Sequence, residues 1–312
     1  MRIIRLADAP DLIPAWDRFV DAHRFGTFWH TSAWLAYQRA YRPENSDESF
    51  ALLDAAGSVV AVAPLVVSKG ADGEPEFSLS GTPTPRVLFR SRNDRYKPTW
   101  VLGIIENERT RIAKRYGVGR GVFGGWATDG DGNVDSPISQ RLIDLTQPEA
   151  TLWRDVRKSY KALIHRGEER FAVGISDSVV YENGFGHYEA LHRRLYAEPR
   201  PDATYYLQYE WLQRGAAVVV LALPPGREVV GAAYWLIYKG SADYASGAYA
   251  EDNVAHAVVW RSLLALKARG VRSTVMAWRG LERTEKERGV THFKVGFGGV
   301  DVPVAVVEVS YA

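Results

Sequence analysis

The feature that most constrains the fold is one order of secondary-structure elements that occurs twice along the chain. In the second half, apolar periodicity predicts the order β-α-α-β-β-β-α-β-α-β between residues 171 and 311. The first half reads β-α-α-β-β-β-α-β between residues 2 and 128. A chain of 312 residues is long enough for two domains. The repeated order therefore predicts a duplicated α/β unit with mixed sheets.

The seam between the two units is predicted from the polar stretch DGDGNVDSPIS, which starts at residue 129, through Thr146. We expect unit 1 over residues 1–145 and unit 2 over residues 146–312. Thr146 and Glu149 have the spacing of a helix capping box. They should start a single helix that runs to Arg170 and opens the second unit.

The composition excludes several kinds of site. The chain has no cysteine, which rules out disulfides, thiolate zinc sites and a cysteine nucleophile. The seam imitates a calcium loop, but Val134 and Gln140 stand where such a loop needs glycine and glutamate, so no metal site is predicted. The N-terminus lacks the apolar region of a signal peptide, and the longest apolar runs are about half a membrane span. We expect a soluble cytoplasmic protein without integral membrane contact.

A row of basic side chains marks the helix predicted over residues 146–170. Its members recur at intervals of three and four and fall within an arc of about 100°: Arg154, Arg157, Lys158, Lys161 and His165. The net charge of the chain is only +2, so the row is a local feature that suits a phosphate backbone. The alternative is a solvated helix face, which the neighbouring Glu168 and Glu169 favour.

An ordered set of segments resembles the Fem-type transferases, which carry two GNAT-like acyltransferase units in one chain. The segments are FWHTSAW, FSLSGTPTP, LWRDVRKSYKALIHRG, RPDATYYLQYEWLQRGAAVVVLA, ADYASGAY, AHAVVWRSLLALKARG and HFKVGFGG. The resemblance covers nearly the whole chain. It implies two tandem GNAT-like α/β units with a cleft between them, and a last strand able to cross back to the first unit. The long helical hairpin of some members is missing.

The resemblance also implies an aminoacyl-tRNA-dependent N-acyltransferase that forms an amide bond. The acceptor would be an amine of a cell-wall (peptidoglycan) precursor, or of a small molecule in an antibiotic or other biosynthetic pathway. No cofactor is expected, since the aminoacyl-tRNA is a co-substrate. Two alternatives stay open: an N-acyltransferase that uses an acyl-CoA, and a non-catalytic binding protein on the same fold.

The loop that binds CoA in ordinary GNAT enzymes has no counterpart here. That loop carries the pattern R/Q-x-x-G-x-G/A between the fourth strand and the next helix, where backbone N–H groups hold the pyrophosphate. Residues 245–257, ASGAYAEDNVAHA, and residues 79–90, LSGTPTPRVLFR, both lack it. The absence argues against CoA and leaves a phosphate-rich donor to be held elsewhere. We therefore expect Arg154, Arg157, Lys158 and Lys161 to contact tRNA phosphates.

The segment HFKVGFGG supplies the main catalytic candidates. By resemblance, Lys294 matches a lysine near the reacting carbonyl or the tRNA end, and Phe293 matches an aromatic beside it. A fixed cation would stabilise the oxyanion that forms when an amine attacks an ester. The alternative is a lysine at a helix end that meets backbone carbonyls.

The acceptor is expected near residues 200–249. Arg200 would hold a phosphate or carboxylate of the acceptor, and Tyr205 is placed in the catalytic group by resemblance, with Tyr206 as its rival. Tyr244 and Tyr249 should line the cleft, one of them partly in the core. None of the histidines is assigned as a general base, and His256 is expected to be a hydrogen-bonded core residue.

Overall fold

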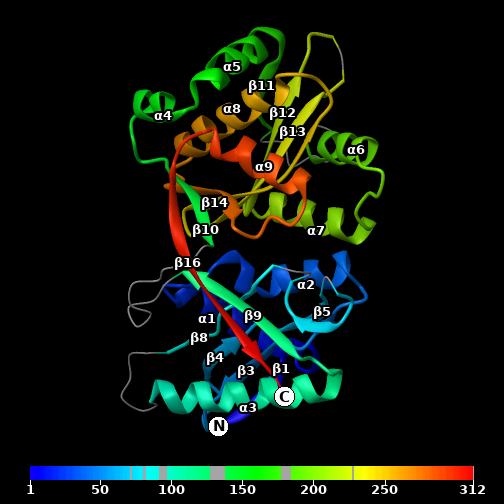
Figure 1. Ribbon diagram of the computed structural model, residues 1–312, viewed down its shortest axis with the longest axis vertical. Helices are drawn as coiled ribbons and strands as arrows, with labels where there is room; N and C mark the ends of the chain where they lie inside the picture. The colour runs from blue at the N-terminus through cyan, green and yellow to red at the C-terminus, as the bar shows by residue number, and fades with distance from the viewer. Residues whose placement is uncertain are drawn as a thin grey trace. The chain divides into compact units, whose positions relative to one another are not determined.

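The computed structural model describes the chain except residues 71, 80–81, 91–96, 127–137, 177–183, 227 and 312. The chain forms two compact units (Figure 1). Unit 1 is Met1–Ser136 together with Pro303–Ala312, and unit 2 is Pro137–Val302. The end of the chain therefore belongs to the first unit. Both units combine helices with mixed sheets, as the sequence predicts.

Unit 1 follows the element order that the first half of the sequence predicts. Its elements are β1 (Arg2–Arg5), the 3-10 helices η1 (Leu6–Asp8) and η2 (Pro10–Leu12), α1 (Ile13–Ala22), η3 (Phe28–His30), α2 (Ser32–Tyr41), β2 (Ser46–Asp47), β3 (Phe50–Leu53), β4 (Val59–Ala63), β5 (Val66–Lys69), β6 (Pro75–Phe77), β7 (Thr84–Pro85), β8 (Leu88–Phe89), α3 (Pro98–Tyr116), β9 (Arg120–Trp126) and most of β16 (Val300–Ser310). Strands β1, β3, β4 and β8 form one antiparallel sheet. In the other sheet, β9 pairs antiparallel with β16 and parallel with β6.

One predicted strand of unit 1 is divided. The sequence predicts a single strand over residues 58–67, but β4 ends at Ala63 and β5 begins at Val66. Pro64 lies between them and has no N–H to donate to a ladder. The chain leaves the first sheet there and enters the second, where β5 pairs with β6.

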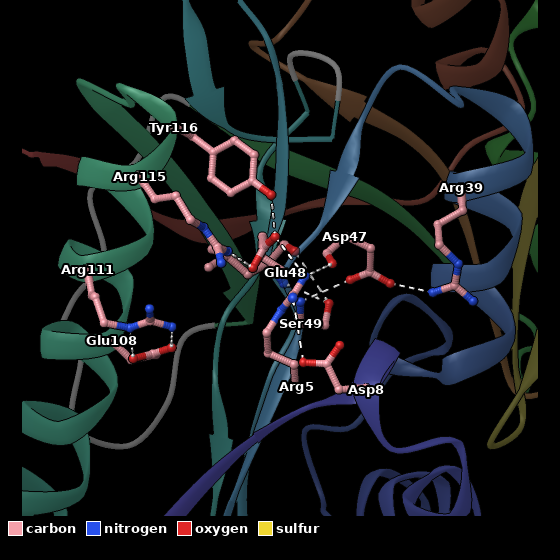
Figure 2. Close-up of polar contacts among 11 residues, drawn as sticks. Arg5, Asp8, Arg39, Asp47, Glu48, Ser49, Glu108, Arg111, Arg115 and Tyr116 are labelled. Atoms are coloured by element: carbon pink, nitrogen blue, oxygen red, sulfur yellow. Dashed lines mark hydrogen bonds and ion pairs between the residues drawn. The ribbon is translucent and has the colours of Figure 1, made fainter.

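A buried carboxylate ties the elements of unit 1 together (Figure 2). The Glu48 side chain is 1% exposed and accepts hydrogen bonds from Arg5 Nη2 at 2.8 Å and from the Tyr116 hydroxyl at 2.5 Å. Arg115 at the end of α3 forms a further ion pair with it. One side chain thus links β1, the start of β3 and the last turn of α3.

Unit 2 follows the order predicted for the second half, with one strand added at its start. Its elements are β10 (Ser139–Asp144), α4 (Glu149–Asp155), α5 (Lys158–Arg170), β11 (Ala172–Ser176), α6 (Phe185–Leu195), α7 (Asp202–Gln213), β12 (Ala217–Leu223), β13 (Gly231–Tyr238), β14 (Ser241–Tyr249), α8 (Val254–Ala268), β15 (Ser273–Arg279), α9 (Glu285–Val295) and the start of β16. The sheet order is β11-β12-β13-β14-β15-β10. Figure 1 shows α5 and α8 on one face of the sheet and α6 and α7 on the other. Trp235, Val258 and Leu263 are fully buried in the core on the α8 face.

The added strand moves the boundary between the units. The sequence prediction placed residues 139–144 in the seam and the division at 145/146, whereas the structure divides the chain at 136/137. The reason is that β10 pairs antiparallel with β15 from Ser139 to Asp144 and completes the sheet of unit 2. The seam residues 129–137 lie outside the described part of the chain.

The predicted basic helix is two helices, and the prediction of one helix is wrong. Helix α4 ends at Asp155, and Val156 and Arg157 have extended backbone before α5 starts. Val156 is 2% exposed in the core, and the Arg157 N–H donates to the Gly296 carbonyl at 2.8 Å instead of continuing the helix. The predicted capping box is also absent, because the Thr146 hydroxyl donates to Asp144 and Pro148 caps α4.

The described residues contain no helix that is both long enough and apolar enough to cross a lipid bilayer. Within the same residues, no group of three or more histidine, cysteine or acidic side chains is placed to hold a metal ion.

Candidate active site

A fork in the sheet of unit 2 provides the place for a site. Strand β14 pairs with β13 from Ser241 to Tyr249, but its parallel pairing with β15 covers only Ser241 to Asp243 in the described chain. A register shift opposite Tyr234 and Trp235 adds one residue, Ala245, to β14 just beyond that point. Strands β14 and β15 therefore part after Asp243. Beyond this residue, the side of β14 that faces β15 is not paired with a strand in the described chain.

Lys294 stands at this fork, in the last turn of α9. A capping box starts the helix: the Thr284 hydroxyl accepts from the Glu287 N–H at 3.1 Å, and the Glu287 carboxylate accepts from the Thr284 N–H at 3.0 Å. The Lys294 amine lies 4.4 Å from the centre of the Tyr244 ring. The side chain is half-buried, and burial lowers the pKa of its ammonium to about 8, while Asp243 opposes the shift.

Asp243 faces the same fork and was missed by the sequence analysis. Burial raises the pKa of its carboxyl to about 7, and the Lys294 charge opposes the shift. Asp243 is half-buried, and its carboxylate has no hydrogen bond or ion pair with another described residue, although its backbone pairs within the sheet. An acidic residue inside the otherwise apolar and aromatic strand ADYASGAY was the signal that could have found it.

Two tyrosine hydroxyls form a pair beside Lys294. The hydroxyls of Tyr244 and Tyr249 lie 2.7 Å apart, and burial raises the pKa of both phenols, so both are neutral. Gly247 permits this pairing, because a Cβ there would lie 2.0 Å from the Tyr244 hydroxyl. Both side chains are half-buried and pack on the core, so they do not divide into one core and one cleft residue.

Arg200, which the sequence analysis expected to bind the acceptor, is brought to the same strand. Its guanidinium donates to the Ser246 hydroxyl at 3.2 Å and to the Tyr188 hydroxyl at 3.3 Å. Tyr196, which the sequence analysis missed, donates its hydroxyl to the Gly247 carbonyl at 3.0 Å. Arg200 and Tyr196 thus approach β14 from the end of α6 and the loop that follows it.

Tyr205 does not line the site, which corrects its placement among the catalytic residues. It is 1% exposed, and its hydroxyl is hydrogen-bonded to Nδ1 of His192 at 2.8 Å. Burial and, secondarily, the charge of Arg200 lower the pKa of His192 to about 4, so this ring is neutral. His192 stacks on Tyr196 with ring centres 4.2 Å apart, so Tyr205 supports Tyr196 from behind. Tyr206 is 64% exposed.

Phe293 lies in a ring cluster next to Lys294. Its ring centre is 5.2 Å from that of His256, 5.3 Å from that of Phe297 and 6.0 Å from that of Tyr160. His256 was expected to be a hydrogen-bonded core residue, but among the described residues its buried Nδ1 has no partner. Burial also lowers the pKa of His256. The cluster fixes the helix turn that carries Lys294.

The comparisons with known proteins establish the fold. No model of a protein family matches the sequence, and no curated relative is found. The crystal structure of FemX superposes with a TM-score of 0.60 at 11% identity, over 99% of this chain and 96% of that one. A tandem GNAT protein from the clavulanic acid biosynthesis pathway gives 0.54 at 11% identity, over 98% of both chains. The C-terminal domain of a putative lysylphosphatidylglycerol synthetase from Agrobacterium fabrum gives 0.52 at 12% identity, over 95% of this chain and 91% of that one.

This chain has a Fem-like tandem GNAT fold. These structures confirm the fold that the resemblance in the sequence implied. Sequence identities of 11–12% establish the fold alone. The fork and the side chains around it all lie in unit 2. The chemistry of the site therefore depends on these side chains.

The start of α8 differs in charge from a phosphate-binding helix start. In a GNAT unit this is the helix that follows the fourth strand, whose N-terminus would hold a CoA pyrophosphate. Here Glu251 and Asp252 directly precede the helix, and Glu251 pairs with Arg170 at 2.9 Å. Gly167 of α5 also packs against this turn, because a Cβ on it would lie 2.9 Å from the Asn253 carbonyl oxygen. Two carboxylates beside the helix start disfavour a pyrophosphate there.

The basic side chains that the sequence analysis expected to contact tRNA lie on both sides of the break between α4 and α5. Arg154 pairs with the adjacent Asp155 at 3.4 Å, and its side chain is 73% exposed. The Lys161 amine donates to the Arg154 carbonyl at 3.2 Å. Lys158 is exposed and pairs with no acid in the described chain. Most of this positive charge is therefore not neutralised within unit 2.

Arg157 has an internal role instead. Its guanidinium is hydrogen-bonded to Nε2 of His292 at 2.7 Å and donates to the Tyr160 hydroxyl at 3.2 Å. The Tyr160 ring in turn packs on Gly296, where a Cβ would lie 2.2 Å from a ring carbon. Arg157 and Tyr160 thus fasten the break between α4 and α5 to the end of α9, next to Lys294.

Proposed function

We propose that the protein is an aminoacyl-tRNA-dependent N-acyltransferase that joins an amino acid to an amine through an amide bond. The observation that carries the proposal is the Lys294 amine, which stands half-buried at the fork of β14 and β15 and contacts the Tyr244 ring. When an amine attacks the ester carbonyl, the oxygen becomes negative, and a fixed cation in a partly desolvated site stabilises that charge. The acceptor is an amine of a cell-wall precursor or of another small biosynthetic molecule.

The places in unit 2 that suit phosphate binding favour tRNA over CoA as the donor. Glu251 and Asp252 disfavour a CoA pyrophosphate at the start of α8. Exposed Lys158 and Arg154 and half-buried Lys161 offer positive charge at the α4–α5 break, which is fastened to the end of α9. These cations bind the phosphates of a tRNA acceptor arm and so bring the aminoacyl ester to Lys294.

Arg200 and the tyrosines suit the binding of the acceptor. Arg200 donates to Ser246 on β14, and the neutral hydroxyls of Tyr244 and Tyr249 lie on the same strand. A guanidinium and neutral phenols orient a polar molecule without repelling a phosphate or carboxylate that it carries. This arrangement supports an anionic acceptor that bears one reactive amine.

A transfer assay with labelled donors tests the proposal. The protein is incubated with tRNA charged with radiolabelled amino acids and with a set of amines that includes cell-wall precursors. We expect label in the acceptor as an amide, and loss of that product when the charged tRNA is treated with ribonuclease beforehand. Transfer from an acyl-CoA that persists after ribonuclease would establish the CoA alternative. Saturable acceptor binding without transfer from either donor would establish a binding protein.

A further inference from the structure

Asp243 and Lys294 are the two oppositely charged groups that the fork brings together. Asp243 is the last residue of β14 that pairs with β15, and Lys294 contacts the ring of the next residue, Tyr244. Each group shifts the titration of the other, yet no ion pair joins them within the described residues. Both are half-buried, so both remain accessible to a substrate.

The other titratable groups near the fork are poorly suited to accept a proton. Tyr244 and Tyr249 are hydrogen-bonded phenols with raised pKa values, and Tyr196 from the end of α6 has a pKa raised by burial. His192 behind Tyr196 is held by Tyr205. Arg200 carries a permanent charge and is a donor only.

His256 is the remaining candidate near Lys294, and its setting is less suitable. Its ring packs edge-on against Tyr160 with ring centres 4.5 Å apart, and burial lowers its pKa. A buried and unpaired Nδ1 gives no partner that would stabilise the protonated ring. At Asp243 burial instead raises the pKa to about 7, and the Lys294 charge favours the ionised carboxylate that can accept a proton.

We propose that Asp243 takes the proton that the acceptor amine loses, that Lys294 gives a proton to the departing ribose oxygen, and that water then carries the proton from Asp243 back to Lys294. The inference rests on the proposed function. In the step, the amine nitrogen bonds to the ester carbonyl carbon and its proton moves to the Asp243 carboxylate. The bond from that carbon to the ribose oxygen breaks, and the oxygen takes a proton from the Lys294 ammonium. Asp243 then releases its proton to water and Lys294 takes one up from water, so the pair is restored without a net proton gained or lost.

The pairing is tested first without any substrate. Reductive methylation followed by mass spectrometry measures the fraction of Lys294 that is uncharged at each pH. Removing the negative charge with Asp243→Asn destabilises the ammonium, so we expect Lys294 to be methylated about fivefold faster at pH 7. Glu285→Gln, an exposed acid at the start of the same helix, is the control and should change nothing. Unchanged methylation of Lys294 in Asp243→Asn would overturn the inference, whichever donor the protein uses.

The catalytic role is tested by single-turnover transfer at several pH values. The wild-type rate should rise through an apparent pKa near 7 and fall through one near 8, both values belonging to the pair. Asp243→Asn should lower the rate at pH 7.5 by about 10²-fold and lose the rising limb, whereas Asp243→Glu should keep it. A wild-type rate or an unchanged rising limb in Asp243→Asn would overturn the base assignment. If methylation responds but wild type transfers from no charged tRNA, the proposed function fails while the pair stands.

Discussion

Lys294 carries the largest effect that we expect from a single side chain. Lys294→Met keeps most of the length of the side chain but removes the amine that lies over the Tyr244 ring, and with it the charge at the fork. Loss of one stabilising group at the oxyanion should reduce the chemical step by about 10²-fold. Single-turnover transfer under saturating substrates measures it, with Lys286→Met on the exposed side of α9 as the control. A Lys294→Met rate equal to wild type would remove Lys294 from the catalytic group.

Gly247 shows how a residue without a side chain shapes the site. In Gly247→Ala the new Cβ would lie 2.0 Å from the Tyr244 hydroxyl and 2.6 Å from the Tyr249 hydroxyl, so the phenols must move. We expect a loss of about 1–3 kcal/mol in the free energy of unfolding, measured with urea. Adding Tyr244→Phe should recover part of it. Gly174→Ala, where a Cβ meets open space, should change stability by less than about 0.5 kcal/mol.

At the scale of elements, the break between α4 and α5 separates two kinds of basic residue. Lys158 and Lys161 carry charge at the start of α5 without an acidic partner in the described chain, whereas Arg157 is used internally by α9. We expect Lys158→Glu/Lys161→Glu to weaken binding of charged tRNA. Each lost phosphate contact should reduce the slope of log K against log salt by about 0.9.

Filter binding of charged tRNA between low and moderate salt measures this slope. Lys114→Glu, one charge reversal at an exposed position of α3, is the control and should leave the slope unchanged. Equal affinity of Lys158→Glu/Lys161→Glu and wild type at low salt would contradict the tRNA contact. Acceptor affinity should not change, because the acceptor groups lie on β14 and around Arg200.

At the scale of the whole molecule, the buried Glu48 carboxylate and its ion pairs stabilise unit 1. Glu48→Gln removes the buried charge that pairs with Arg5 and Arg115 in unit 1 (Figure 2). Both arginines are partly exposed and regain water, so we expect a loss of about 2 kcal/mol rather than the larger cost of a fully buried pair. Urea unfolding measures it, and the loss should fall on the transition of unit 1. Glu308→Gln, in an exposed ion pair with Arg120, should cost less than about 1 kcal/mol.

Apolar patterning along the chain predicts most of the order of elements in both units. The short run AAVVVLAL, rich in β-branched valine, predicts a strand and the periodicity of NVAHAVVWRSLLALKARG predicts a helix, and β12 and α8 lie at these places. Short or interrupted segments were harder. Residues 139–144 have no strong alternation and become β10 because β15 offers an edge.

Only the tertiary structure decided which side chains meet. Helical spacing put Arg157 in a row with Lys158, but the Gly296 carbonyl takes the Arg157 N–H and ends the helix there. Spacing could not tell Tyr205 from Tyr206, since which one is buried depends on where His192 lies. Asp243 and Lys294 are far apart in sequence, and their opposed pKa shifts exist only because the strands part beside the end of α9. Local propensity is carried by neighbouring residues, whereas desolvation and charge pairing depend on distances that only the folded chain sets.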